Sequence, residues 1–339
     1  MTGPRCFIAG CSGFSLTPDE VSFFRDADPV GFILFRRNIA DPDQVRALTD
    51  SLRETVGRAD APIFVDQEGG RVQRLGPPHW PKYPAGRTYG RLSSDPEGRR
   101  RLAQTGARLI GHDLRAVGID VDCLPVLDVP IPGAHDIIGD RAYDTDPAIV
   151  AMLGRAAAEG LMEAGVLPVI KHMPGHGRAS VDSHESLPRV SAGIDELRAQ
   201  DFVPFRALRD LPIGMTAHVV YEAIDPDGPA TTSASVIGQI IRGELGFDGL
   251  LLTDDLSMKA LSGSFRERAE AAFRAGCDVA LHCNGNLDEA GAVAEAAPAL
   301  AGETLRRFKA ARARVAGQQA SFDIADARRG FEAALAEAA

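Results

Sequence analysis

The chain has 339 residues, 45% of them hydrophobic and 25% charged, which is ordinary for a globular protein and excludes a disordered or fibrous one. Its formal net charge of −10 argues against a nucleic-acid partner, because its Lys and Arg residues are scattered and form no basic patch. The five cysteines form no CxxC pair, which disfavours a disulfide framework and favours a reducing compartment. The sequence shows neither a secretory signal nor about 18 consecutive apolar residues. We therefore expect a soluble, cytoplasmic protein with no membrane partner.

Short apolar runs bounded by turn residues alternate with longer segments of helical period along the chain. The runs hardly alternate between apolar and polar residues, which is typical of strands buried on both faces of a parallel sheet. The expected strands are 7–9, 30–35, 62–66, 121–127, 168–171, 213–217, 249–253 and 278–282. The expected helices are 18–27, 42–56, 97–117, 147–164, 194–208, 233–245 and 265–275, followed by two or three more.

Repeated strand–helix units without a break in composition predict one α/β domain over residues 1–339. A closed (β/α)8 barrel of the TIM type, with extra C-terminal helices, fits best, and an open doubly wound sheet is the alternative. Barrel enzymes build their sites at the carboxyl ends of the strands, where one polar residue alone could be a helix cap. Several together predict a shared site. The strand-end residues are Asp66, Asp128, His172, His218, Asp254 and His282.

The first stretch with chemical potential is Val65-Asp-Gln-Glu-Gly-Gly-Arg-Val-Gln-Arg74, where an acidic strand end runs into glycines and arginines. Asp66 could accept hydrogen bonds from two neighbouring hydroxyl groups of a ligand, and Arg74 could hold a carboxylate or hydroxyl with its forked donors. An internal Asp66–Arg74 ion pair that stiffens the loop explains the same residues equally well.

The second stretch is Lys171-His-Met-Pro-Gly-His-Gly177, whose first two side chains should face the mouth of the barrel. Gly175 and Gly177 would let the following loop move over a ligand. A zinc site is the alternative for His172, His176 and the later His184, but the spacing is not HExxH and no cysteine is near. We therefore expect neither a metal nor a cofactor.

Asp182-Ser-His184 follows in the same loop and places a carboxylate close to an imidazole. Such a carboxylate fixes the tautomer of the histidine and stabilises its protonated form, as a histidine that exchanges protons near neutral pH requires.

The third stretch is Leu250-Leu-Leu-Thr-Asp-Asp-Leu-Ser-Met258, in which an apolar strand ends on paired acids. Asp254, facing the mouth, could act as a nucleophile. Asp255 should point elsewhere, because consecutive side chains of an extended backbone diverge, and capping of the next helix is its expected role.

Together these stretches resemble family 3 glycoside hydrolases, and within that family the short bacterial β-N-acetylhexosaminidases of cell-wall recycling. The resemblance covers nearly the whole chain. Its motifs are Asp66-Gln-Glu-Gly-Gly-Arg-Val-Gln-Arg74, Pro125-Val-Leu-Asp-Val129, Gly139-Asp-Arg141, Lys171-His-Met-Pro-Gly-His-Gly177, Asp182-Ser-His184, Met215-Thr-Ala-His218 and Thr253-Asp-Asp-Leu-Ser-Met258. One departure is Gly177-Arg-Ala-Ser180, where relatives often read Gly-Asp-Thr.

The resemblance implies that Asp254 is the catalytic nucleophile, that His184 is the acid/base and that Asp182 orients His184. The related β-glucosidases have Asp-Trp at the nucleophile, so Asp255 favours the hexosaminidase branch. The positions matched to sugar binding are Asp66, Arg74, Arg141, Lys171 and His172.

The activity implied is that of a retaining exo-β-N-acetylglucosaminidase that works without a cofactor as a monomer. It would remove non-reducing terminal GlcNAc from peptidoglycan fragments, GlcNAc-1,6-anhydro-MurNAc with or without peptide, through a covalent glycosyl-aspartate. Phosphorolysis is an alternative, because a histidine acid/base leaves room for an anionic phosphate. A metal-dependent barrel hydrolase and a non-catalytic sugar-binding module are weaker alternatives.

Overall fold

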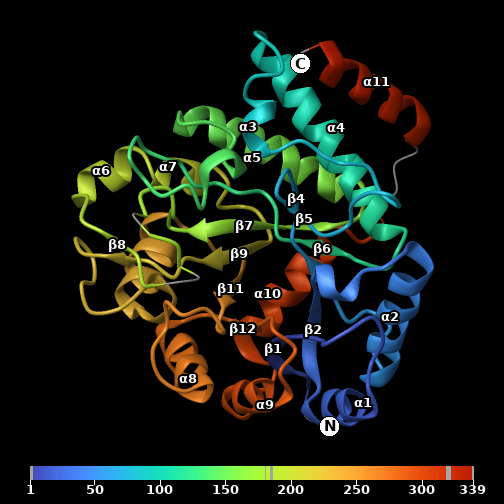
Figure 1. The fold of residues 1–339 in the computed structure, drawn as a ribbon. Helices are drawn as coiled ribbons and strands as arrows, with labels where there is room; N and C mark the ends of the chain where they lie inside the picture. Colours follow the sequence, from blue (N-terminus) through green and yellow to red (C-terminus); the bar gives the residue numbers. More distant parts are fainter. Residues whose placement is uncertain (1–2, 180, 184–185, 318–321, 338–339) are drawn as a thin grey trace.

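The computed structural model describes residues 3–179, 181–183, 186–317 and 322–337. Eight parallel strands close into a barrel in the order β1-β12-β11-β9-β7-β6-β3-β2 (Figure 1). The predicted TIM-type barrel is therefore confirmed. The barrel strands are β1 (Arg5–Gly10), β2 (Pro29–Leu34), β3 (Ile63–Val65), β6 (Val121–Asp122), β7 (Leu167–Met173), β9 (Ile213–Thr216), β11 (Leu250–Asp255) and β12 (Val279–His282).

Helices surround the barrel (Figure 1). They are α1 (Pro18–Ala27), α2 (Pro42–Thr55), α3 (Gly86–Tyr89), α4 (Pro96–Arg115), α5 (Pro147–Glu163), α6 (Ile194–Ala199), α7 (Phe202–Ala207), the π-helix η4 (Val236–Glu244), α8 (Phe265–Ala275), α9 (Leu287–Ala296), α10 (Gly302–Ala313) and α11 (Ile324–Glu337). Two small sheets pair β4 (Gln67–Gly69) with β5 (Val72–Gln73) and β8 (Arg189–Val190) with β10 (Val220–Tyr221). Within the described residues, no helix has the length and apolar character needed to span a bilayer.

Four helices begin in the same way, with a residue whose side chain caps the helix followed by a proline. Thr17 caps α1, and Asp41, Asp95 and Asp146 cap α2, α4 and α5, each by accepting a hydrogen bond from a backbone N–H of the first turn. Proline fits the first helical position because its missing N–H would have no partner there. These local signals explain why the predicted starts of these four helices lie within one residue of the observed ones.

The prediction of one helix over 194–208 is wrong, because the segment forms α6 and α7 with a break at Gln200 and Asp201. Pro204 has no N–H to donate to the carbonyl of Gln200, so a continuous helix would lose a hydrogen bond there. The predicted strand 121–127 is also shorter than expected, since β6 ends at Asp122 and Pro125 follows.

Alternation along each strand decides which side chains enter the barrel. Leu252 and Leu281 belong to the cluster inside it, whereas Ala280 packs outside against the helices. His282 therefore points outward, where its Nε2 lies 3.3 Å from Glu289 of α9. The prediction that all six strand-end residues converge on the mouth is wrong for His282.

Candidate active site

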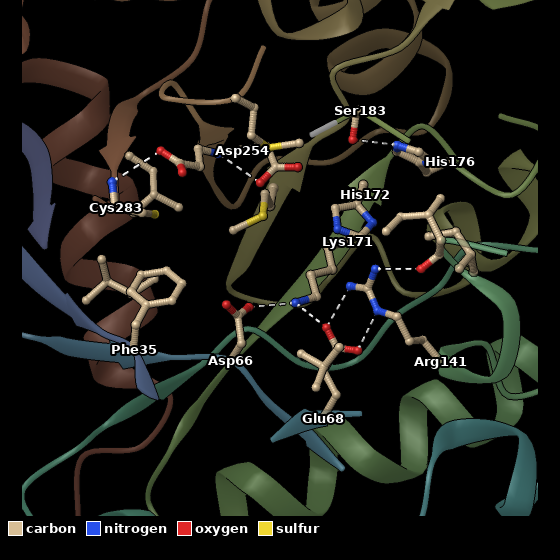
Figure 2. A pocket seen from close by; sticks show the side chains of 18 of the residues that line it. Phe35, Asp66, Glu68, Arg141, Lys171, His172, His176, Ser183, Asp254 and Cys283 are labelled. Carbon is tan, nitrogen blue, oxygen red and sulfur yellow. Dashed lines mark hydrogen bonds and ion pairs between the residues drawn. The ribbon is translucent and has the colours of Figure 1, made fainter. Parts of the chain in front are cut away.

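A cavity of about 270 Å³ opens at the carboxyl ends of the barrel strands. This volume is close to the lower end of the range of about 300–1,000 Å³ for ligand pockets and suits one small polar ring. Figure 2 shows the side chains that surround it. Of the predicted site residues, those that line the cavity are Asp66, Arg74, Arg141, Lys171, His172 and Asp254.

Lys171 lies at the base of the cavity between two carboxylates. Its Nζ is 2.9 Å from Oδ1 of Asp66 and 2.6 Å from Oε1 of Glu68, and only 2% of its side chain is exposed. Burial lowers the pKa of Lys171, but the charges of Asp66 and Glu68 outweigh it and hold that pKa above its usual value. Lys171 is therefore a fixed cation.

Asp66 pairs with Arg74 as well as with Lys171, so the predicted internal ion pair exists (3.0 Å). Burial raises the pKa of Asp66, but the two cations overcome it and leave that pKa well below its usual range. Both residues also line the cavity, and the Arg74 guanidinium lies 5.2 Å from the centre of the Phe35 ring. The ion pair and a role in ligand binding are therefore compatible.

Glu68 is a central residue of the site that the sequence reasoning did not single out. Its carboxylate accepts hydrogen bonds from Nε (2.8 Å) and Nη2 (2.7 Å) of Arg141, besides its contact with Lys171 (Figure 2). Burial raises the pKa of Glu68, yet Arg141 and Lys171 bring it down to about 2. The available signal was spacing, because residues two apart on an extended backbone share a face and Asp66 was already a candidate.

Asp122 of β6 holds the backbone between these two carboxylates. Its Oδ1 accepts a hydrogen bond from the backbone N–H of Gln67 (2.9 Å), which lies between Asp66 and Glu68. Burial raises the pKa of Asp122 well above its usual value. Asp122 thus fixes the backbone that carries Asp66 and Glu68.

His172 is oriented from below by Asp128, another of the strand-end residues. Nδ1 of His172 donates to Oδ2 of Asp128 (2.7 Å), which leaves Nε2 for the cavity. Oδ1 of Asp128 accepts from the backbone N–H groups of His172 (3.1 Å) and His176 (2.7 Å). Burial raises the pKa of Asp128, but His172 and His176 bring it down to about 2.

Asp254 lies near the end of β11 and faces the cavity from the side opposite Asp66 (Figure 2). One of its oxygens, Oδ1, accepts a hydrogen bond from the backbone N–H of Asp255 (2.8 Å). Its side chain is directed toward His172 and Ser183 in this view. A carboxylate so placed can attack a carbon held in the cavity.

Asp255 differs from its prediction in two respects. It lines the same cavity as Asp254, although its carboxylate turns aside to accept hydrogen bonds from the backbone N–H groups of Ser257 (3.0 Å) and Cys283 (3.2 Å). It caps a turn and no helix, because α8 begins only at Phe265 with Ser264 as its cap. The carbonyl of Asp255 meets Nε2 of His218 (3.0 Å), which places that strand-end histidine beneath the site.

The loop after β7 supplies a wall of the cavity on the same side as Asp254 (Figure 2). Nε2 of His176 lies 3.2 Å from Oγ of Ser183, and both side chains line the cavity. Burial, followed by the nearby His172, lowers the pKa of His176 to about 4, so its ring is neutral near pH 7. Asp182 is half-buried beside Ser183, and the predicted acid/base His184 lies outside the described residues.

The glycines of this loop are required by close contacts. A Cβ on Gly177 would lie 2.0 Å from the carbonyl oxygen of Val129, and Gly175 has a φ of +137°. These contacts explain why glycine is required at both positions; that the loop moves over a ligand stays a prediction. In the part of the chain that the structure describes, no group of three or more His, Cys, Asp or Glu side chains is arranged to hold a metal ion.

Comparison with known proteins agrees with this geometry. A model of the glycosyl hydrolase family 3 N terminal domain matches residues 18–317. The chain belongs to glycosyl hydrolase family 3. This family 3 chain is 42% identical over 289 residues to a Beta-hexosaminidase from Alkalilimnicola ehrlichii, which covers 84% of the chain and 81% of that protein. It is 40% identical over 275 residues to a Beta-hexosaminidase from Pseudomonas aeruginosa, which covers 80% of each.

Solved structures of family 3 proteins share the fold. NagZ from Neisseria gonorrhoeae, in complex with N-trifluoroacetyl-D-glucosamine, has a TM-score of 0.84 and 32% identity over 99% of this chain and 98% of that one. A family 3 β-N-acetylglucosaminidase from Paenibacillus has a TM-score of 0.86 and 32% identity over 97% of this chain, which spans 66% of that protein. The chain is thus a glycosidase of the β-hexosaminidase type, as its motifs predicted.

Proposed function

We propose that this family 3 glycosidase is a retaining exo-β-N-acetylglucosaminidase that removes one non-reducing terminal GlcNAc at a time. The observation that carries the proposal is that Asp254 and Ser183, the sequence neighbour of Asp182, line the same cavity of about 270 Å³. Because this volume suits a single sugar ring and its base is filled by the paired side chains of Lys171 and Glu68, the cavity favours a chain end over an internal unit.

In the first step, an oxygen of Asp254 attacks the anomeric carbon while His184 gives its proton to the departing glycosidic oxygen. The bond to the leaving group breaks and a glycosyl-aspartate ester forms. In the second step, His184 takes a proton from water, which attacks the same carbon and releases Asp254. Two displacements on one carbon retain its configuration. Asp182 would orient His184 in both steps.

The charged base of the cavity would hold the sugar ring. Asp66 and Lys171 are already ionised and fixed, so they can bind ring hydroxyl groups without reorganisation, and Nε2 of His172 adds a further polar group. Arg141 is positioned by Glu68 beside them. Contacts of this kind lower the barrier when they strengthen in the transition state.

For the natural substrate we propose GlcNAc β-linked to 1,6-anhydro-MurNAc, with or without peptide. Support comes from the relatives named Beta-hexosaminidase and NagZ, and from Arg74 at the cavity, whose guanidinium suits the carboxylate of a muramic acid unit. We also propose that the enzyme acts in the cytoplasm as a monomer. The five buried, free cysteines suit that reducing compartment.

The test is to follow hydrolysis of an aryl β-N-acetylglucosaminide by NMR. The proposal predicts that the β-anomer of GlcNAc appears first and that added phosphate leaves the product unchanged. Initial release of the α-anomer would contradict a double displacement, and GlcNAc 1-phosphate as the product would show the phosphorolytic alternative instead.

A further inference from the structure

Arg178 is buried in the loop after β7, and three of its nitrogens contact the α6–α7 region. Its Nε donates to Oδ2 of Asp201 (2.6 Å), Nη1 to Glu196 (2.5 Å) and Nη2 to Oε1 of Gln200 (2.8 Å). Only 6% of the Arg178 side chain and none of the Asp201 side chain is exposed. The guanidinium therefore ties the loop to the point where the two helices meet.

The same part of the loop is fixed by its backbone on the side of the barrel. The N–H of His176 donates to Asp128 (2.7 Å), and the carbonyl of Ala179 accepts from the N–H of His135 (2.8 Å). The close approach of Gly177 to Val129 leaves no room for a shift in that direction. Residues 176–179 are thus held between the barrel on one side and Arg178 with its partners on the other.

Ser183 returns to this fixed segment through its contact with His176, and both side chains face the cavity. The position of Ser183 relative to Asp254 therefore depends on where residues 176–179 lie. Asp182 and His184 are the direct neighbours of Ser183 in the sequence. A displacement of the fixed segment would carry through to the groups that are proposed to exchange the proton.

The Arg178–Asp201 pair is poorly explained by stability alone. Oδ1 of Asp201 is buried without a hydrogen-bond partner among the described residues, so the desolvation of this carboxylate is only partly compensated. Burial raises the pKa of Asp201 to about 6 even though Arg178 opposes it. Replacing a buried ion pair by apolar side chains of similar volume is often neutral or stabilising, whereas the planar fork of arginine fixes direction as well as distance.

We propose that Arg178 is a positioning residue for the acid/base step of the reaction. By fixing residues 176–179 against α6 and α7, it holds the segment with Asp182 and Ser183 on the leaving-group side of Asp254. This inference rests on the proposed function, in which His184 protonates the leaving group.

The test compares kcat/KM, which reports formation of the glycosyl-enzyme, for two GlcNAc β-glycosides. A 2,4-dinitrophenyl leaving group needs little protonation, whereas an alkyl leaving group needs it fully. Arg178→Met is combined with Asp201→Asn so that no unpaired carboxylate is left buried. We expect the double variant to unfold near the wild-type temperature, to lose about 100-fold on the alkyl glycoside and to lose less than about 3-fold on the dinitrophenyl one.

Arg178→Lys, which keeps one cationic contact, should show an intermediate loss on the alkyl glycoside alone. Equal losses on both substrates, or no loss on either, would overturn the positioning role of Arg178. His184→Ala is the reference variant. If it shows no greater loss on the alkyl glycoside, the proposed function fails and the inference with it; if it does and the Arg178 variants do not, only the inference fails.

Discussion

The base of the cavity and its loop wall are built in different ways. At the base, Lys171 lies on the barrel strand β7, Asp66 directly follows β3 and Glu68 lies on the short strand β4 that comes next, and each is paired within 3.0 Å. At the wall, His176 and Ser183 lie on a loop whose outer anchor, Arg178, binds helices outside the barrel. In the proposed mechanism, ligand binding therefore depends on the barrel itself, whereas proton transfer depends on a contact between peripheral elements.

The two regions also differ in their charges. The base holds buried carboxylates whose pKa values lie far below normal because cations surround them. The wall holds His176, whose burial lowers its pKa to about 4 and keeps it neutral. The charged base of the cavity can bind a polar ring by fixed hydrogen bonds. Because the ring of His176 is neutral, the wall places no permanent positive charge from this histidine beside Asp254.

The largest effect is expected from Asp254→Asn, which removes the proposed nucleophile. Both the base of the cavity and its loop wall act on this group in the proposed mechanism. The amide cannot form the glycosyl ester, so kcat should fall by roughly 10⁴-fold while the unfolding temperature hardly changes. Steady-state kinetics and thermal unfolding check both statements. Asp255→Asn is the matched control, because this carboxylate holds a turn, and a loss as large as that of Asp254→Asn would contradict the assignment.

Glu68→Gln tests the contribution of the base of the cavity alone. It leaves Lys171 and Arg141 with one carboxylate fewer in a site where 3% of the Glu68 side chain is exposed. We expect a loss of about 3 kcal/mol in the free energy of unfolding and a KM that rises more than kcat falls. Urea denaturation and steady-state kinetics provide the measurements. A fall in kcat with an unchanged KM would place Glu68 in the chemical step and contradict the assignment of the base of the cavity to ligand binding.

The stability of the protein at acid pH should also depend on the carboxylates at and below the base of the cavity. Glu68 has a folded pKa of about 2 against an ordinary 4.5, and Asp128 has about 2 against 3.8. A carboxyl group whose pKa is lower in the folded than in the unfolded protein stabilises the native state at pH values above its ordinary pKa. This stabilisation is lost as the pH falls toward the folded pKa of about 2. The urea midpoint should therefore drop between about pH 4.5 and 2, and less steeply in Glu68→Gln. Equal slopes in both proteins would show that Glu68 is not the source.

Ser183→Ala tests the wall and should have the smallest effect. It removes one hydrogen bond, to Nε2 of His176, worth about 1 kcal/mol. We expect kcat/KM for an alkyl glycoside to fall by about 5-fold with little change in the unfolding temperature. A loss near that of Asp254→Asn would mean that Ser183 takes part in the chemistry directly.

The barrel was predictable because its strands are buried apolar runs and its long helices carry Pro and Asp or Thr at their starts. Asp66, Lys171 and Asp254 were predictable because each is a polar residue at or near the carboxyl end of an apolar strand. Two other features could not be predicted, because they depend on which way a side chain points where a strand ends. These are the outward orientation of His282 and the contact of Glu68 with both Lys171 and Arg141. The Arg178–Asp201 pair depends on helix packing, which no local pattern reveals.

The central claim is that Asp254 forms a covalent bond with the sugar. Incubation with an activated fluorinated aminosugar, followed by proteolysis and mass spectrometry, tests it most directly. We predict one modified peptide that carries the sugar on Asp254, and no modified peptide in Asp254→Asn. An adduct on another residue, or rapid turnover with inverted configuration and no adduct, would contradict the account.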